Sequence, residues 1–186
     1  FYGNFAMLVR ALCYIYAFGP EGISEISEGA VLNANYVKAR LKGHYHLPYE
    51  TATLHEAVFS DKNLLKDHHV STLDVAKRMM DFGLHPPTIY FPLVVKGALM
   101  SEPTETESKE DLDRLVDVMI QIANESAENP KKVQEAPHNL GIKRLDEVLG
   151  SKPAQELLEA ETDYATGGTE DGLADLAAEL SAAGSF

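Results

Sequence analysis

The stretch of sequence that decides the fold is residues 85–108, which read HPPTIYFPLVVKGALMSEPTETES. Its consecutive prolines, Pro86 and Pro87, exclude a helix at the start of the stretch and favour an extended backbone just before it. Residues 88–91 are β-branched or aromatic and predict a short strand. Pro92 ends that run, so we expect it at a sheet edge or in a loop. The stretch therefore predicts a short strand, a second apolar run at 98–100 and a polar turn that leads into a helix.

That helix is predicted over residues 109–127. Ser108 is the expected N-cap, because a serine hydroxyl can accept a hydrogen bond from the first turn, and the acids of that turn suit the positive end of the helix dipole. Apolar residues recur at helical spacing along it, namely Leu112, Leu115, Val116, Met119, Ile120 and Ala123. We therefore expect Leu115 and Met119 to be buried, and Asn129-Pro130 to end the helix.

Three segments upstream of the prolines complete the expected core. Residues 72–82 predict a helix that begins at a capping box, with Ser71 as the cap, and ends at Gly83. The polar residues 60–71 predict a loop, and residues 55–59, just before it, are expected to form a strand through a family resemblance that is given below. Together these elements predict an α/β domain in which helices pack on one face of a small, mostly antiparallel sheet.

The N-terminal region predicts two helices, residues 5–18 and residues 20–43, which are separated by Gly19-Pro20. In the first helix apolar residues surround the cylinder, and Arg10 is its only charge. A helix that is apolar on all sides must be buried on several sides. We therefore expect the isolated chain to self-associate or aggregate until a partner covers this helix.

Composition excludes several classes of partner. The chain has 186 residues, enough for one core, and a net charge of −13, which argues against nucleic acid or an anionic membrane as a partner. No apolar run approaches the length of a membrane span, and the first residues do not read as a signal peptide. The single cysteine, Cys13, cannot form an internal disulfide. A reducing, cytoplasmic location is therefore expected.

The histidines do not predict a metal site. Two close pairs, His44 with His46 and His68 with His69, lie in loop-like stretches that lack the cysteine partners and the helical spacing of zinc sites. The sequence also contains no phosphate-binding loop, dinucleotide fingerprint or nucleophile elbow. Residue types and spacing alone therefore identify no catalytic centre.

Several strings in the sequence are similar to one known family and occur in the same order. They are FYGNFAMLVRA at 1–11, GPEGISEISEGAVLNANYVKARL at 19–41, LDVAKRMMDFGLHPPT at 73–88, EPTETES at 102–108 and APH at 136–138. The chain resembles the C-terminal region of glycine dehydrogenase (decarboxylating), the pyridoxal-phosphate P-protein of the glycine cleavage system. The similarity is to the second subunit of the two-subunit prokaryotic form.

The resemblance implies a domain organisation. Residues 1–148 resemble the C-terminal small domain of a fold-type I pyridoxal-phosphate enzyme, with residues 1–43 as helices between its domains. Residues 149–186 match nothing in the family. From residue 151 onward they carry eight acidic residues and a single lysine. We expect this segment to be an acidic, partly helical extension.

The resemblance also implies a function. In the family, glycine forms an aldimine with pyridoxal 5'-phosphate, loses carbon dioxide and passes its aminomethyl group to the lipoyl arm of the H-protein. The lysine that holds the cofactor lies in a segment that this chain lacks, so no cofactor is expected on this chain alone. The implied partners are the P-protein α subunit, the missing cofactor-binding domain and the H-protein, in an oligomer.

His85 and Thr88 are the candidate catalytic residues, both through the resemblance. Their motif, HPPT, lies in the family where the small domain closes over the cofactor. For His85 the alternative is a turn residue that is hydrogen-bonded to the backbone. For the whole chain the alternative is a non-catalytic module for subunit interaction, without cofactor. No residue of the chain is a candidate cofactor or metal ligand.

Overall fold

The structure is a computed structural model that describes residues 3–145. Within them the chain forms five helices and three strands, and residues 1–143 belong to one compact unit. The elements are α1 (Phe5–Leu41), β1 (Ala57–Ser60), α2 (Lys62–His68), α3 (Thr72–Asp81), β2 (Thr88–Ile89), β3 (Ala98–Ser101), α4 (Lys109–Glu128) and α5 (Pro130–Gln134). No helix in this part of the chain is long and apolar enough to cross a membrane. The predicted extension at 149–186 lies outside the described residues.

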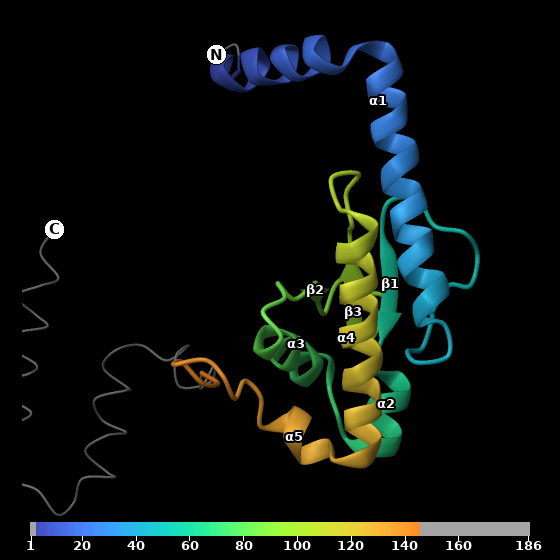
Figure 1. Ribbon diagram of the computed structural model, residues 1–186, viewed down its shortest axis with the longest axis vertical. Helices are drawn as coiled ribbons and strands as arrows, with labels where there is room; N and C mark the ends of the chain where they lie inside the picture. Colours follow the sequence, from blue (N-terminus) through green and yellow to red (C-terminus); the bar gives the residue numbers. More distant parts are fainter. Residues whose placement is uncertain (1–2, 146–186) are drawn as a thin grey trace, which may run out of the picture. The chain divides into compact units, whose positions relative to one another are not determined.

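The sheet consists of three antiparallel strands in the order β1-β3-β2 (Figure 1). The central strand β3 is buried along its whole length, which explains the apolar run at 98–100. The edge strand β2 is only two residues long, because Tyr90 leaves it with a positive φ of 58° and Pro92 follows. The predicted α/β class and the small antiparallel sheet are confirmed.

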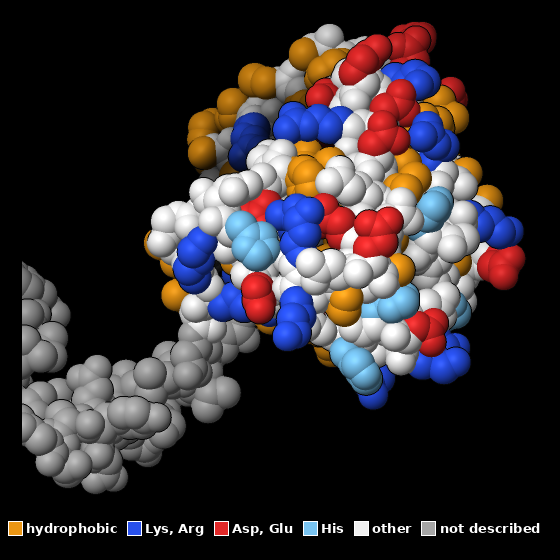
Figure 2. All heavy atoms as spheres, turned by 60° about the horizontal axis from the view of Figure 1, so that its bottom comes forward, with side chains coloured by type: hydrophobic (Ala, Val, Ile, Leu, Met, Phe, Trp, Pro, Cys, Tyr) orange, Lys and Arg blue, Asp and Glu red, His pale blue; other side chains and the backbone are white. Residues whose placement is uncertain are grey.

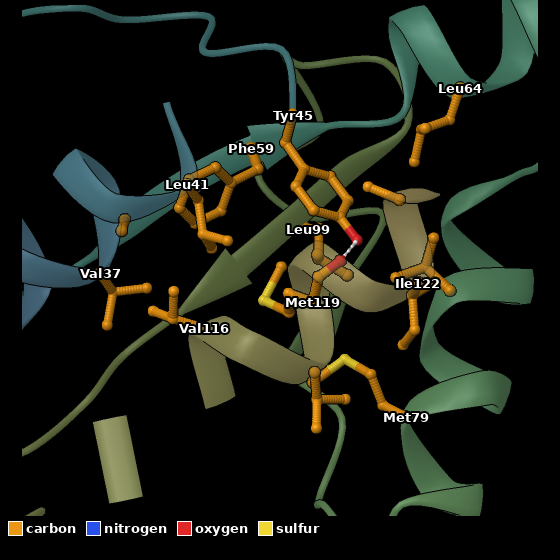
Figure 3. Packing of buried hydrophobic residues seen from close by; sticks show 14 of the residues in the cluster. Val37, Leu41, Tyr45, Phe59, Leu64, Met79, Leu99, Val116, Met119 and Ile122 are labelled. Carbon is orange, nitrogen blue, oxygen red and sulfur yellow. Dashed lines mark hydrogen bonds between the residues drawn. The ribbon is translucent and has the colours of Figure 1, made fainter. Parts of the chain in front are cut away.

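The core lies between the sheet and α4 (Figure 3). Phe59 of β1 and Leu99 of β3 pack in one cluster with buried side chains of α4, among them Met119. The Tyr45 hydroxyl donates a hydrogen bond to the Met119 carbonyl at 2.9 Å, and burial raises the pKa of this phenol. Helices α1, α2, α3 and α5 each contact α4, so this helix organises the helical layer.

One burial prediction for α4 is wrong. Met119 is fully buried as expected, but Leu115 is only half-buried. The fully buried stripe passes through Val116 and Ile122 instead. Leu115 lies at its margin, where the side chain lines a surface pocket next to Leu84.

The predicted helix starts are confirmed in atomic detail. The Ser71 hydroxyl accepts from the Asp74 amide at 3.3 Å, and the Asp74 carboxylate accepts from the Ser71 amide at 2.8 Å, which completes a capping box. The Ser108 hydroxyl accepts from the Asp111 amide at 3.1 Å. Gly83 follows α3 with a φ of 71°, the left-handed conformation that favours glycine.

Two short helices differ from the sequence prediction. Helix α2 occupies Lys62–His68, inside the segment that was predicted as a loop. Helix α5 begins at Pro130, because proline is tolerated in a first helical turn and so starts a new helix where α4 ends. Each helix buries a single apolar side chain, Leu64 in α2 and Val133 in α5. With one buried position neither helix shows a repeating apolar stripe, which is why periodicity did not reveal them.

The two predicted N-terminal helices are present as one element, α1, with a break at Gly19 (φ 64°, ψ −177°). The second of them ends at Leu41 rather than at Gly43. We call residues 5–18 the N-terminal arm. The large apolar side chains of the arm that are exposed are Phe5, Met7, Leu8, Val9, Leu12, Tyr14, Ile15, Tyr16 and Phe18.

After the break, α1 is fastened to the segment that precedes β1. The side-chain amide of Asn35 donates to the Thr53 carbonyl at 2.8 Å, and its oxygen accepts from the Thr53 amide at 3.0 Å. The buried Lys38 ammonium donates to the Thr51 carbonyl. These bonds hold the segment in place, so that Glu56 is positioned at the entrance to β1.

A buried ionic network joins α3, α4 and α5. Arg78 donates to Glu125 at 2.8 Å and to Asp81 at 2.9 Å, while Lys132 donates to Glu125 at 2.8 Å. Burial acts against ionisation of Glu125, but its hydrogen bonds from Arg78, Lys132 and Gln121 outweigh burial and lower its pKa to about 2. The network therefore depends on Glu125 being charged.

One face of the molecule mixes charges of both signs. Figure 2 shows a face on which lysine, arginine, acidic and histidine side chains alternate without forming a broad field of one sign. A cationic site on this acidic chain must therefore be identified from individual residues and their partners.

Candidate functional site

His85 lies in a surface pocket of about 300 Å³ between the end of α3 and the start of α4. The chain reaches it through the turn at Gly83, and the following prolines keep the backbone extended. The imidazole is exposed and has no hydrogen-bond partner among residues 3–145. The alternative of a turn residue hydrogen-bonded to backbone therefore has no support in this part of the chain.

The pocket also contains a guanidinium group. Arg114 of α4 donates to the Phe82 carbonyl at 2.9 Å, which directs its side chain across the gap toward the end of α3. That single bond leaves most of its five N–H donors available. Glu107 and Asp111 supply carboxylates on the same lining. The pocket thus combines an imidazole with a guanidinium that can bind a carboxylate.

Thr88 is placed differently from His85. It lies on the edge strand β2, where it pairs with Met100 of β3, and its side chain is exposed. Thr88 is not among the residues that line the pocket. The structure therefore brings His85 together with Arg114 and leaves Thr88 three residues further along the chain, on the neighbouring strand.

Two carboxylates face each other at one end of the sheet. The register pairs Ala57 with Ser101, so the next antiparallel pair outward is Glu56 with Glu102. A hydrogen bond with Glu56, burial and the Glu56 charge together raise the pKa of Glu102. Because Glu102 also lines the pocket of His85, this carboxylate pair is an extension of the same site. Two acids that share a proton can exchange it with a neighbouring group.

His55 joins this carboxylate pair. Its Nε2 lies 3.4 Å from Glu56 Oε1, and ligand atoms of His55, Glu56 and Glu102 all lie within 4.8 Å of one another. Imidazole and carboxylate groups together can hold a divalent cation. The two histidine pairs considered from the sequence form no such group within the described residues. Of the residues described, these three are the set that could hold a metal ion.

Sequence reasoning missed Arg114, Glu56 and Glu102. Arg114 lies on the exposed side of an amphipathic helix, where a charge is ordinarily a solvated residue. The two glutamates are 46 positions apart, and only the strand register makes them neighbours. The available signal was that Glu56 lies in the expected strand at 55–59 and that Glu102 closely follows the apolar run at 98–100. To use this signal, one would have had to know that β1 pairs with β3.

The lining of the pocket bears on cofactor chemistry. A covalently held pyridoxal cofactor requires a lysine ammonium in the site. The residues around His85 supply an imidazole, a guanidinium, carboxylates and a hydroxyl, but no lysine. They therefore do not fit a covalently bound pyridoxal phosphate, and we derive no reaction step on that cofactor from this chain.

Known proteins resemble the chain over most of its length. A family model described as glycine dehydrogenase, C-terminal domain, matches residues 26–143. The probable glycine dehydrogenase (decarboxylating) subunit 2 of Staphylococcus haemolyticus is 58% identical over 152 residues, which is 82% of this chain and 31% of the relative. The protein of the same name from Pyrococcus abyssi is 54% identical over 153 residues, 81% of this chain and 30% of the relative. The chain thus matches less than a third of the length of these curated relatives.

Proposed function

The chain belongs to the family of the glycine dehydrogenase C-terminal domain, and on that premise we propose that it works as the C-terminal part of the decarboxylating subunit 2. The whole enzyme would carry out pyridoxal-phosphate-dependent decarboxylation of glycine and transfer of the aminomethyl group to the lipoyl H-protein. The observation that carries the proposal is the continuous match over residues 26–143, which includes the pocket of His85.

In this proposal the chain contributes side chains but not the cofactor lysine. His85 would face the reacting groups and hold or move a proton at a ring nitrogen, and Arg114 would bind a carboxylate in the same pocket. Thr88 would contribute its hydroxyl from the edge strand. The pyridoxal phosphate, which acts as an electron sink when bound, would be held by the part of the subunit that precedes this chain.

The N-terminal arm supports an interaction with further protein. Its exposed apolar side chains would form a contiguous patch of the kind that marks interaction sites. We propose that the missing cofactor-binding domain and the α subunit cover it in an oligomeric, cytoplasmic enzyme. The second candidate function, a non-catalytic interaction module, is favoured by the same arm and by the lack of lysine around His85.

The decisive experiment reconstitutes the enzyme from parts. The chain is co-expressed with the preceding part of subunit 2 and with the α subunit, and exchange of labelled carbon dioxide with glycine is measured in the presence of H-protein. The catalytic proposal expects activity that His85→Asn lowers by at least about tenfold. His44→Asn, outside the pocket, should leave it unchanged. Full activity with His85→Asn would instead support the interaction module.

A cofactor experiment tests the division of labour. The purified chain should hold no covalently bound pyridoxal phosphate at the site of His85, because that site provides no lysine. Borohydride reduction followed by mass spectrometry measures this directly. A stable adduct on a single lysine would contradict the proposal and place the cofactor on this chain.

A further inference from the structure

A second and larger pocket, of about 530 Å³, lies on a part of the fold that the proposed function does not use. It opens between the segment before β1, the helix α2 and the loop that precedes β3. A cavity of this size is in the range that holds small organic molecules. None of its lining residues also lines the pocket of His85.

The charge of this pocket is opposite to that of the chain. Lys62, Lys66 and Lys96 line it, and none of the three ammonium groups has an acidic partner among residues 3–145. The one acid of the lining, Asp61, is buried and accepts a hydrogen bond from the Thr72 amide at 2.8 Å. Three lysines that have no acidic partner among the described residues thus line one cavity in a chain whose net charge is −13.

Lys62 and Lys96 lie next to a close contact between Asp61 and Gly97, which we call the junction. Gly97 packs its Cα against the Asp61 carboxylate, and its carbonyl accepts from the Asp61 amide at 3.1 Å and from the Thr72 hydroxyl at 2.7 Å. Lys62 directly follows Asp61, and Lys96 directly precedes Gly97. The junction therefore fixes the two backbone positions from which these lysines project. Lys66 lies one helical turn after Lys62, on the same side of α2.

The remaining lining is largely apolar and includes an aromatic ring. Leu65, Val94 and Tyr49 are exposed large side chains at the mouth of the cavity. Lysine ammonium groups bind phosphate as point charges, and an apolar rim can bury the organic part of a ligand. We propose that this pocket binds a small phosphate ester non-covalently, with Lys62, Lys66 and Lys96 around the phosphate and the rim around its organic group.

The test uses the 186-residue chain with phenyl phosphate as the probe and follows the ³¹P linewidth of the ligand, a readout that tolerates self-association of the protein. The double variant Lys66→Gln/Lys96→Gln should weaken binding about fourfold to twentyfold, since each exposed ion pair contributes modestly. The matched control Lys77→Gln/Lys131→Gln removes the same charge from outside the pocket. It should leave the affinity within about twofold. Binding should weaken as salt is added.

Two outcomes would overturn the proposal. Equal weakening by both double variants would show attraction to overall charge rather than to this pocket. Inorganic phosphate that binds as tightly as phenyl phosphate, with no loss in Leu65→Ser, would remove the assignment of an organic ester. A preference for phenyl phosphate that disappears in Leu65→Ser and in Lys66→Gln/Lys96→Gln supports it.

Discussion

The two halves of α1, which meet at the break at Gly19, have opposite surroundings. Before Gly19, the N-terminal arm exposes nine large apolar side chains. After Pro20, the helix buries Ala34, Val37 and Leu41 and binds the segment before β1 through Asn35. The spacing of apolar residues predicted a helix in both halves, although only the second half is packed against other described residues. The spacing therefore does not reveal which elements cover a helix. The comparison indicates that the second half is stabilised by this chain, whereas the described residues leave the arm uncovered.

The largest expected contrast is between an arginine of the packed core, Arg78 on α3, and an arginine of the arm, Arg10. Within residues 3–145, Arg78→Ala leaves the buried Asp81 carboxylate without a cationic partner and Glu125 with Lys132 as its one remaining cation, and should lower the free energy of unfolding by roughly 3 kcal/mol. Arg10→Ala in the arm removes a side chain without a partner among the described residues and should change it by less than about 0.5 kcal/mol. Urea unfolding followed by circular dichroism measures both. Similar losses in the two variants would contradict the contrast.

A pair of leucines compares the same chemistry in the two halves of the helix. Leu41 is fully buried, so Leu41→Ala should lower the free energy of unfolding by about 2–5 kcal/mol. Leu12 is 53% exposed, and Leu12→Ala should cost less than about 0.5 kcal/mol while reducing self-association in light scattering. If Leu12→Ala cost as much as Leu41→Ala, the chain itself would bury the arm.

Acid should unfold the packed region and spare the arm. Glu125 has its pKa lowered from 4.5 to about 2 in the folded state, so its stabilising contribution is complete above about pH 4.5. As the pH falls from about 4.5 to about 2 that contribution is lost, roughly 3 kcal/mol in all. The arm contains no acidic residue and has no such dependence.

The check is a pH series of unfolding free energies. Glu125→Gln should be less stable at pH 7 and should show a flatter curve between about pH 4.5 and pH 2 than the unmodified chain. Parallel curves for the two proteins would assign the acid sensitivity to other carboxylates.

The smallest expected difference in stability is between variants that remove the N-cap of α4 and the N-cap of the arm. Ser108→Ala removes the acceptor of the Asp111 amide from a helix that carries the core, and should cost about 1 kcal/mol. Asn4 caps the arm through the Met7 amide at 3.3 Å, and Asn4→Ala should not change global unfolding measurably. Thermal unfolding of both variants tests this. A larger effect at Asn4 would mean that the arm unfolds together with the core.

The predictable parts of the fold are those in which local sequence and tertiary structure agree. Ser71, Gly83 and Ser108 act within one helical turn of themselves, so their roles follow from short-range geometry. The apolar spacing predicted helix α4, but it did not predict which residues lie in the middle of its buried face. Leu115 and Val116 are adjacent, and only the elements packed against the helix decide that Val116 is the fully buried one. Short helices with one buried residue gave no periodic signal.

The site was predictable only in part, for the same reason. His85 was found through its motif, and the structure places it in a pocket. Arg114 and Glu102 come to that pocket from a helix and from the end of a strand, and Glu56 lies opposite Glu102 on the neighbouring strand. No local pattern connects the three residues. Their proximity follows from the pairing of β1 with β3, which depends on contacts between distant parts of the chain. Whether His85 and Thr88 act in catalysis stays a prediction.

The close contact between Gly97 and Asp61 restricts how this sequence can diverge. A Cβ added at Gly97 would lie 1.9 Å from Asp61 Oδ1, on a backbone with a φ of 63°. Any other residue at position 97 therefore collides with the carboxylate, and shortening Asp61 alone leaves the Thr72 amide without its acceptor. Neither position can drift independently. During evolution the two residues should therefore be retained together or replaced together. The same constraint fixes where Lys62 and Lys96 lie, because they are the chain neighbours of Asp61 and Gly97.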